Sequence, residues 1–166
     1  MGKVQSTFLN GSPGAISRSV DDIVISLKNV GEVDIPFGAP VFLTTGGAIG
    51  FSTSSPQDFT TFLGFAVRVA DKTPDTYPVG QFNDNQAGAW KPGDVMEILV
   101  RGGIVITLAA NGNLGGNVYI RKSDGKLTPE AGSSGTTVQL QNVRIRNPRR
   151  TGDTCCEVIV NERNII

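Results

Sequence analysis

Residues 32–43 read EVDIPFGAPVFL, and this stretch decides the fold. We interpret it as a short strand, a kink and a second strand. Pro36 and Pro40 impose the kink, because a proline ring restricts φ and removes a backbone donor from any sheet. No side chain in the stretch indicates catalysis, so the stretch predicts a scaffold element.

The rest of the chain after residue 35 has the pattern of short strands separated by turns. Every apolar run is brief, and the gaps between runs carry glycine, proline, asparagine or aspartate. Tight hairpins are expected at Gly46-Gly47, Gly102-Gly103 and Asp124-Gly125. Further strands are expected at residues 62–69 and 154–160. These features predict an all-β fold, a small β-barrel or a tulip-like sandwich of short antiparallel strands.

Two segments need a choice between interpretations. Residues 19–30 carry helix signals, but their β-branched residues and the alternation of Ile23, Ile25 and Leu27 favour a strand. In residues 138–146 the apolar residues change from even to odd positions. A bulge near Gln141 and Asn142 restores one apolar face, so we predict a bulge there.

The length of 166 residues favours one compact unit. Residues 1–20 are dominated by glycine, serine, proline and asparagine, and their only sizeable apolar side chains are Phe8, Leu9 and Ile16. Such a segment buries too little apolar area to offset its own ordering entropy. We therefore expect residues 1–20 to form an extended N-terminal arm, disordered or ordered against a partner, and residues 21–166 to form a single β domain.

Charge and composition indicate assembly more than nucleic-acid binding. Fifteen basic and fifteen acidic side chains give zero net charge, so repulsion does little to oppose self-association. Binding to phosphates requires a basic excess that this chain lacks. The first residues lack the apolar core of a signal peptide, and no stretch approaches 18 apolar residues. We expect synthesis in a cytoplasm without a membrane step.

The inventory of reactive side chains argues against an enzyme. The chain has no histidine, the commonest general acid or base, and its two cysteines are the neighbours Cys155 and Cys156. Adjacent cysteines make a strained disulfide, so reduced thiols are expected, and no zinc site can be completed. The adjacent carboxylates Asp21 and Asp22 are interpreted as structural. An enzyme based on carboxylate chemistry remains the less favoured alternative.

One cluster of basic side chains stands out, in a stretch without acids: Arg144, Arg146, Arg149 and Arg150. Arginine is favoured at interfaces, so the cluster is a candidate docking site for an anion or an acidic partner surface. The alternative is that these arginines are solvated, or that they pair with Glu157 and Glu162 on the last strand. The sequence leaves both interpretations open.

Several short motifs, taken in order, resemble the structural cement proteins of tailed bacteriophages, also called capsid decoration or head auxiliary proteins. The resemblance covers approximately residues 30–166, with a fainter match at residues 14–18. Its motifs are IPFGAPV at 35–41, FLGFAV at 62–67, PGD at 92–94, ILVRG at 98–102 and GNVYI at 116–120. The paired cysteines and the Arg149-Arg150 loop depart from the family pattern.

The resemblance implies a structural protein of the virion that is not an enzyme and needs no cofactor or metal. It implies binding of the major capsid protein on the outer surface of the capsid, as a homo-oligomer and specifically a trimer, which stabilises contacts between capsomers. It implies no nucleic-acid or membrane partner, and synthesis in the cytoplasm of the host bacterium. The partner-binding residues expected on this basis are Phe8, Leu9, Ile16, Arg18, Arg144, Arg146, Arg149 and Arg150. A receptor- or glycan-binding β module of a virion is the alternative.

Overall fold

The computed structural model describes residues 10–17, 21–54, 58–69, 88–150, 152–162 and 164. Apart from one 3₁₀ turn, η1 (Phe59–Thr61), the regular structure in these residues is all β, which confirms the predicted class. The strands are β1 (Ile23–Lys28), β2 (Ile35–Pro36), β3 (Pro40–Thr44), β4 (Gly47–Gly50), β5 (Phe62–Ala66), β6 (Ala89–Trp90), β7 (Val95–Thr107), β8 (Asn117–Arg121), β9 (Leu127–Thr128), β10 (Thr137–Asn147) and β11 (Cys155–Val160).

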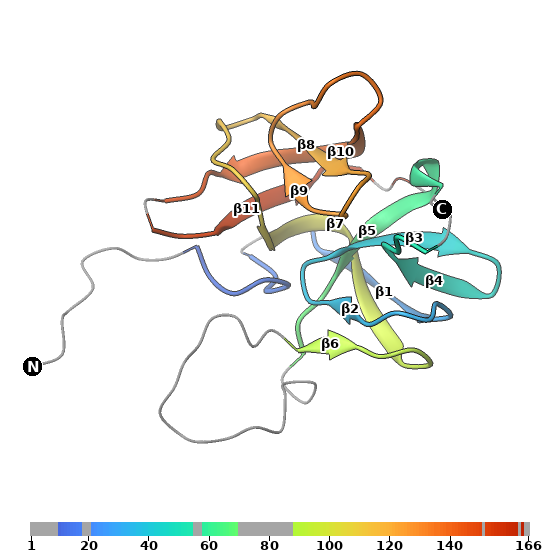
Figure 1. Cartoon of the computed structure of the whole chain (residues 1–166). Helices are drawn as coiled ribbons and strands as arrows, with labels where there is room; N and C mark the ends of the chain where they lie inside the picture. Colours follow the sequence, from blue (N-terminus) through green and yellow to red (C-terminus); the bar gives the residue numbers. More distant parts are fainter. Residues whose placement is uncertain are drawn as a thin grey trace, which may run out of the picture.

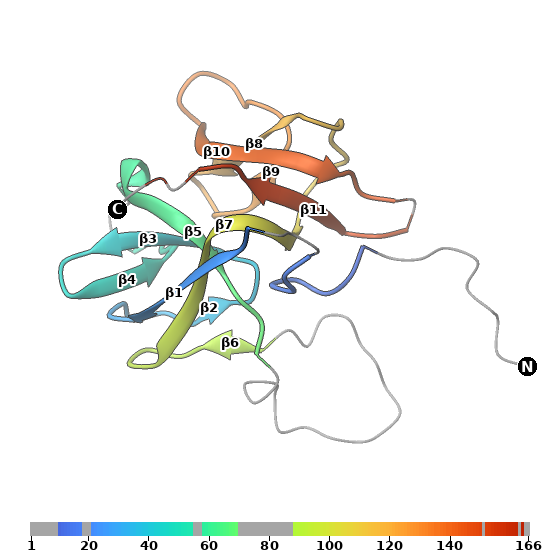
Figure 2. The same ribbon diagram turned by 180° about the vertical axis from the view of Figure 1, so that it is seen from behind.

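One curled antiparallel sheet contains nine of these strands. Its order is β4-β3-β5-β7-β11-β10-β8-β9, and β1 also pairs with β7. The long strand β7 joins two groups of strands, with β8 to β11 on one side and β1, β3, β4 and β5 on the other (Figure 1). Strand β1 lies behind β7 in Figure 1 and in front of it in the reverse view of Figure 2. The short strands β2 and β6 form a separate pair.

Strands β3 and β5 and the second half of β7 are largely buried on both faces and supply two hydrophobic cores. Successive side chains on a strand point to opposite faces. Val41 and Leu63 accordingly belong to one core, whereas their neighbours Phe42 and Phe62 belong to the other. Every residue of β5 is buried. This two-sided burial explains why the apolar runs of these strands lack a polar alternation.

The stretch at residues 32–43 folds as the sequence predicts. Strand β2 ends at Pro36, a turn follows in which the Ala39 N–H donates to the Pro36 carbonyl at 3.1 Å, and β3 begins at Pro40. Gly38 occupies this turn at φ 74°, a conformation that glycine adopts without a steric penalty. The second strand thus enters the sheet, while the first pairs with Trp90 of β6.

The predicted hairpin at Gly102-Gly103 is wrong, because β7 continues through both glycines as one strand. Gly102 has φ 118°, which kinks the strand instead of reversing it. The neighbours explain both glycines: a Cβ on Gly102 would collide with the carboxylate of Asp22, and a Cβ on Gly103 would collide with the Ser17 hydroxyl. The two glycines therefore allow the N-terminal segment to approach β7 closely. From the sequence alone, glycines with this role look the same as glycines in a tight turn.

The kink also redirects β7 from one core to the other. Before it, even-numbered side chains belong to the core that contains Trp90; after it, even-numbered side chains belong to the core that contains Phe42. These residues are Met96, Ile98 and Val100 before the kink, and Ile104 and Ile106 after it. An undistorted strand would keep all of them on one face. The two glycines are thus the point at which one strand serves both halves of the sheet.

The other predicted elements are present, two of them with shifted bounds. Residues 23–28 form a strand. Strands β3 and β4 form the predicted hairpin, but its turn is Thr45-Gly46 in place of Gly46-Gly47, and the strand predicted at residues 62–69 ends at Ala66. Strands β8 and β9 pair across the turn that contains Asp124. In β10, Asn142 has φ 60°, the register against β8 shifts between Gln139 and Arg144, and the apolar residues on both sides of the shift are buried. That irregularity is the bulge expected from the change of parity.

Candidate partner interface

Part of the predicted arm lies against β7 of the same chain. The Gly14 N–H donates to the Val105 carbonyl at 2.8 Å, and the Val105 N–H donates to the Ala15 carbonyl at 2.9 Å. The Ser17 N–H donates to the Gly103 carbonyl at 2.9 Å. Ile16 forms an antiparallel bridge with Ile104 and remains 40% exposed. Hydrogen bonds between backbone groups thus fix the path of residues 14–17. The Ile16 side chain is not used in these bonds and stays accessible.

Gly14 sets how closely this segment approaches the domain. Its carbonyl accepts a hydrogen bond from the Arg68 N–H at 2.8 Å, so it bridges β7 and the segment that follows β5. A Cβ at Gly14 would lie 2.8 Å from the Phe37 Cβ and 2.9 Å from the Arg68 nitrogen, and its φ is 78°. Only glycine satisfies both the conformation and the space. The arm is therefore built into the domain at this point.

Asn10 anchors the arm to the loop that precedes β11. Its backbone N–H donates to Asp153 Oδ2 at 2.9 Å, and its side-chain amide donates to the carbonyls of Pro148 and Cys155, each at 2.9 Å. The other carboxylate oxygen of Asp153 accepts from the Cys155 N–H at 2.9 Å. Asp153 is 6% exposed. A buried carboxylate that accepts two backbone N–H groups is a strong local constraint.

Two of the four predicted arginines are engaged with nearby backbone or amide groups. Arg149 donates from Nε to the Asp153 carbonyl at 2.8 Å and from a terminal nitrogen to the Leu108 carbonyl at 3.0 Å. Arg144 donates to the side-chain oxygen of Asn117 and to the Val143 carbonyl. These contacts hold the loop before β11 and the strand pair β8–β10.

The remaining two arginines are exposed. Arg146 forms an ion pair with Glu157 at 3.7 Å, one of the partners that the sequence suggested. An ion pair at such an accessible site contributes little to stability. Arg150 lies in the loop between β10 and β11. Their charge is therefore present on the surface beside the residues that hold Asn10.

The anchor joins Asn10 to the loop that carries Arg149 and Arg150. Leu9 directly precedes Asn10, and Arg149 directly follows Pro148, which Asn10 contacts. Phe8, Leu9 and Arg18 themselves lie outside the described residues. Sequence reasoning missed Asn10 and Asp153, because a single asparagine and a single aspartate carry no pattern that pairs them.

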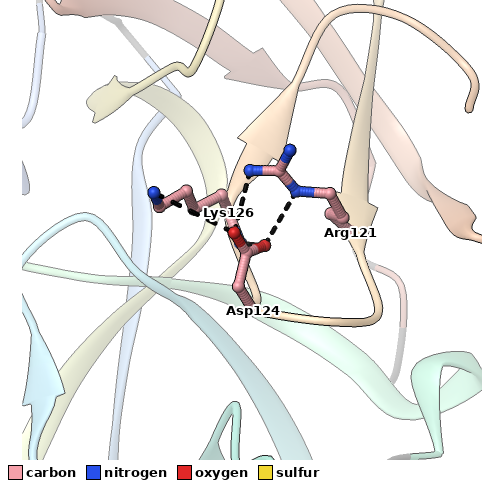
Figure 3. A network of polar contacts seen from close by, with 3 residues as sticks. All are labelled: Arg121, Asp124 and Lys126. Carbon is pink, nitrogen blue, oxygen red and sulfur yellow. Dashed lines mark hydrogen bonds and ion pairs between the residues drawn. The ribbon is translucent and has the colours of Figure 1, made fainter.

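A shallow apolar pocket of about 240 Å³ lies elsewhere on the surface, between the turn after β2 and the turn between β8 and β9. It is lined by residues 36–40, Thr107, Ala109 and residues 125–127. Beside it, Asp124 accepts two hydrogen bonds from Arg121, at 2.9 and 2.8 Å, and lies 3.9 Å from the Lys126 ammonium (Figure 3). The Arg121 hydrogen bond lowers the pKa of Asp124 below its ordinary value of 3.8. This network stabilises the turn, and it pairs the negative charge of Asp124 with the positive charges of Arg121 and Lys126.

The thiols lie in the terminal strand. Cys155 and Cys156 are both buried and not joined to each other, which confirms the expected reduced state. Burial raises the pKa of Cys156 to about 12, and the neighbouring Cys155 adds to this effect. A thiol of this kind stays protonated and is a poor nucleophile. Cys156 therefore acts as a small apolar side chain of the core that contains Phe42.

The described ranges contain neither a metal-binding group of three or more histidine, cysteine, aspartate or glutamate residues nor a helix long and apolar enough to cross a membrane. Their polar groups are instead used in turns, in the anchor of the arm and in surface ion pairs. The predicted site residues that the structure describes as exposed are Ile16, Arg146 and Arg150.

Comparison with known proteins shows the fold and the family of the chain. One chain of a solved structure entitled "The capsid of Myoviridae Phage XM1" has the same fold, with a TM-score of 0.69 and 17% identity over 97% of this chain and 96% of that chain. No curated protein matches the sequence. A family model described as "Structural cement protein (E217 gp24/Pam3 gp6)" matches residues 3–159. With nearly its whole length covered, the chain belongs to this family of phage structural cement proteins.

Proposed function

We propose that the protein binds the outer surface of the phage head through the major capsid protein and stabilises contacts between capsomers. Family membership supports a structural place in the phage capsid. The surface that we assign to the capsid contact combines the start of the arm with the arginine loop. Its proposed members are Phe8, Leu9, Ile16, Arg18, Arg146 and Arg150, while Arg144 and Arg149 support it from within the chain.

The observation that carries this proposal is the contact between Asn10 and Pro148 at 2.9 Å. It gives the arm a fixed starting point at the edge of the domain, directly beside the arginine loop. Apolar side chains that project from a fixed point lose less entropy on binding than side chains on a free tail. Exposed arginines around an apolar centre have the composition typical of protein interfaces.

We propose further that the protein acts as a homo-oligomer, a trimer. Zero net charge supports self-association, since little repulsion opposes it. Several arms on one oligomer would meet repeated sites on one shell, and effective concentration then makes weak single contacts tight together. A ligand that binds only the assembled shell also disfavours its disassembly.

The test is to mix purified protein with undecorated, expanded heads and to count the bound copies by image reconstruction. The informative variant lacks residues 1–9 and retains the anchored segment 10–17, so the domain keeps every contact described above. We expect this variant to fold and to lose most of its occupancy on heads. The variant Asp34→Asn, which changes an exposed carboxylate away from the arm, is the matched control and should bind normally.

Full occupancy by the shortened protein would refute a capsid-binding role for the arm. Density on the inner face of the shell would refute the outer location. Measurement of solution mass tests the trimer separately, and a lone monomer at all concentrations would refute it. Binding to host-envelope glycans without binding to heads would favour a receptor-binding module instead.

A further inference from the structure

The sequence contains two Asn-Gly pairs, Asn10-Gly11 and Asn111-Gly112. In such a pair the glycine nitrogen can attack the side-chain amide carbon of the asparagine, because a glycine has no side chain to obstruct the approach. The new C–N bond closes a succinimide ring, the bond to the amide nitrogen breaks, and ammonia leaves with the proton of the glycine nitrogen. Water then opens the ring and gives aspartate or isoaspartate. The reaction needs only water, so the local structure decides whether each pair reacts.

The pair Asn111-Gly112 lies in the irregular segment that joins β7 to β8 (Figure 1). Asn111 is exposed, and neither its side chain nor the Gly112 N–H forms a hydrogen bond with the described part of the chain. The nearest described backbone hydrogen bonds flank the pair, at the Ala109 N–H and at the Asn113 carbonyl, with lengths of 2.8 and 2.9 Å. Within the described residues, no hydrogen bond of the pair itself therefore opposes the rotation that brings the glycine nitrogen to the amide carbon.

Packing keeps a glycine at position 112. A Cβ there would collide with Ile145 Cδ1 and would lie 2.7 Å from the Pro129 Cβ. Ile145 belongs to the core that contains Phe42, so a larger residue at position 112 would have to displace a core side chain, which costs stability. A larger residue would also obstruct the attack on Asn111. The fold therefore requires the residue that makes Asn111 reactive.

The pair Asn10-Gly11 has the opposite surroundings. The Asn10 side-chain nitrogen, which is the leaving group, donates to the carbonyls of Pro148 and Cys155 at 2.9 Å each. The Asn10 backbone N–H donates to Asp153 Oδ2 at 2.9 Å. Ammonia can leave only after both side-chain hydrogen bonds break, and the carboxylate that forms would then face two carbonyl oxygens without a donor between them. The anchor of the arm therefore opposes the reaction at Asn10.

We propose that Asn111 is a site of spontaneous deamidation in the folded protein and that the anchor protects Asn10 from the same reaction. Each event at Asn111 adds one negative charge to a chain whose net charge is zero. The isoaspartate product also carries the main chain through the side-chain carbon, which lengthens the loop between β7 and β8. Aged protein is therefore a mixture of charge forms that differ in this loop. The reaction occurs in the isolated chain, so it depends on neither heads nor oligomers.

Peptide mass mapping of the unmodified chain tests both sites. The protein is incubated at mildly alkaline pH, either folded in buffer or unfolded in urea, and digested at intervals. In the folded sample we expect the peptide with Asn111 to show the mass change from an amide to a carboxyl group, at a rate close to that in urea. The peptide with Asn10 should react in urea but about tenfold or more slowly in the folded sample, because two hydrogen bonds must break first. An intact Asn111 in the folded sample, or equal rates at the two folded pairs, would overturn the proposal.

Variants connect each rate to its cause. Asn111→Gln, checked for native fold by circular dichroism, should remove the main acidic form seen on ion-exchange chromatography, because the longer side chain closes a ring far more slowly. Asp153→Asn, which weakens the anchor, should raise the folded rate at Asn10 and leave the rate at Asn111 unchanged. Asp34→Asn, the same change at an exposed position away from the arm, should alter neither rate. Persistence of the acidic form in Asn111→Gln would exclude Asn111 as the site, and an unchanged rate at Asn10 in Asp153→Asn would exclude protection by the anchor.

Discussion

Asp153 accepts the backbone N–H of Asn10 at 2.9 Å, across 143 positions of sequence. This bond joins the N-terminal segment to the loop before the last strand and places Asn10 beside the loop that carries Arg149 and Arg150. It has no counterpart in the local patterns of either segment. The position of Asn10, from which the residues of the proposed capsid contact continue, therefore depends in part on one buried carboxylate.

We expect Asp153→Asn to release the arm. The amide that replaces one carboxylate oxygen presents a donor to a donor, so either the Asn10 N–H or the Cys155 N–H loses its acceptor. A buried donor left without an acceptor costs about 1–3 kcal/mol. Hydrogen exchange should show faster exchange at Gly14 and Ser17, and urea unfolding should show lower stability. Asp34→Asn should change neither, and unaltered protection of the arm in Asp153→Asn would contradict the anchor.

Gly102 and Gly46 both have a positive φ, but only Gly102 has neighbouring atoms close to an added Cβ. Alanine substitution at each position therefore separates backbone strain from steric collision. Gly102→Ala should lower the free energy of unfolding by about 3 kcal/mol or more, because the φ of 118° is unfavourable and the new Cβ meets Asp22. Gly46→Ala has a φ of 83° but no atom within 4 Å of the new Cβ, so its cost should be about 1–2 kcal/mol. Equal losses in denaturant unfolding would show that Asp22 does not constrain the kink.

Asp124 should titrate below its ordinary pKa of 3.8 because Arg121 donates hydrogen bonds to the charged form. A folded-state pKa lower than the unfolded one stabilises the protein above pH 3.8, and this contribution is lost as the pH falls through the folded-state pKa. The group is solvent-accessible, so the effect on stability is small and weakens with salt. Carboxyl NMR should show that Arg121→Ala raises this pKa toward 3.8.

Asp58 provides the internal reference for that titration. Its pKa is also lowered, but the cause is hydrogen bonding from Thr60, without an arginine. Arg121→Ala should therefore leave Asp58 unchanged. A parallel shift of both carboxyl groups would indicate a general change of fold in place of the loss of one contact.

Cys156 should resist thiol reagents in the folded protein. Burial raises its pKa to about 12, so at pH 8 the reactive thiolate is scarce and the sulfur is shielded. A maleimide reagent followed by mass spectrometry should leave Cys156 unmodified in the native state and modify both cysteines in denaturant. Rapid native labelling of Cys156 would contradict its place in the core.

Several elements were predictable because local patterns determine them. The alternation of Ile23, Ile25 and Leu27 outweighed the helix signals around it, since these side chains cover one face of a sheet. In β10 the apolar residues change from even to odd positions, and this change located a bulge at Asn142. Without a bulge, the apolar residues on one side of the change would lie on the exposed face of the strand. The proline kink at residues 36–40 followed from the fixed φ of proline.

The sequence by itself determined the all-β class, most strand positions and the family, because each depends on residue periodicity, turn chemistry or ordered motifs. Tertiary structure alone decided that Gly102 and Gly103 kink a continuous strand and that Asn10 meets Asp153. A glycine pair permits a turn and a kink equally, and the choice is made by the Asp22 and Ser17 side chains that occupy the space where its Cβ atoms would lie. Likewise, hydrogen bonds between segments at opposite ends of the chain depend on the folded path, which local patterns do not encode.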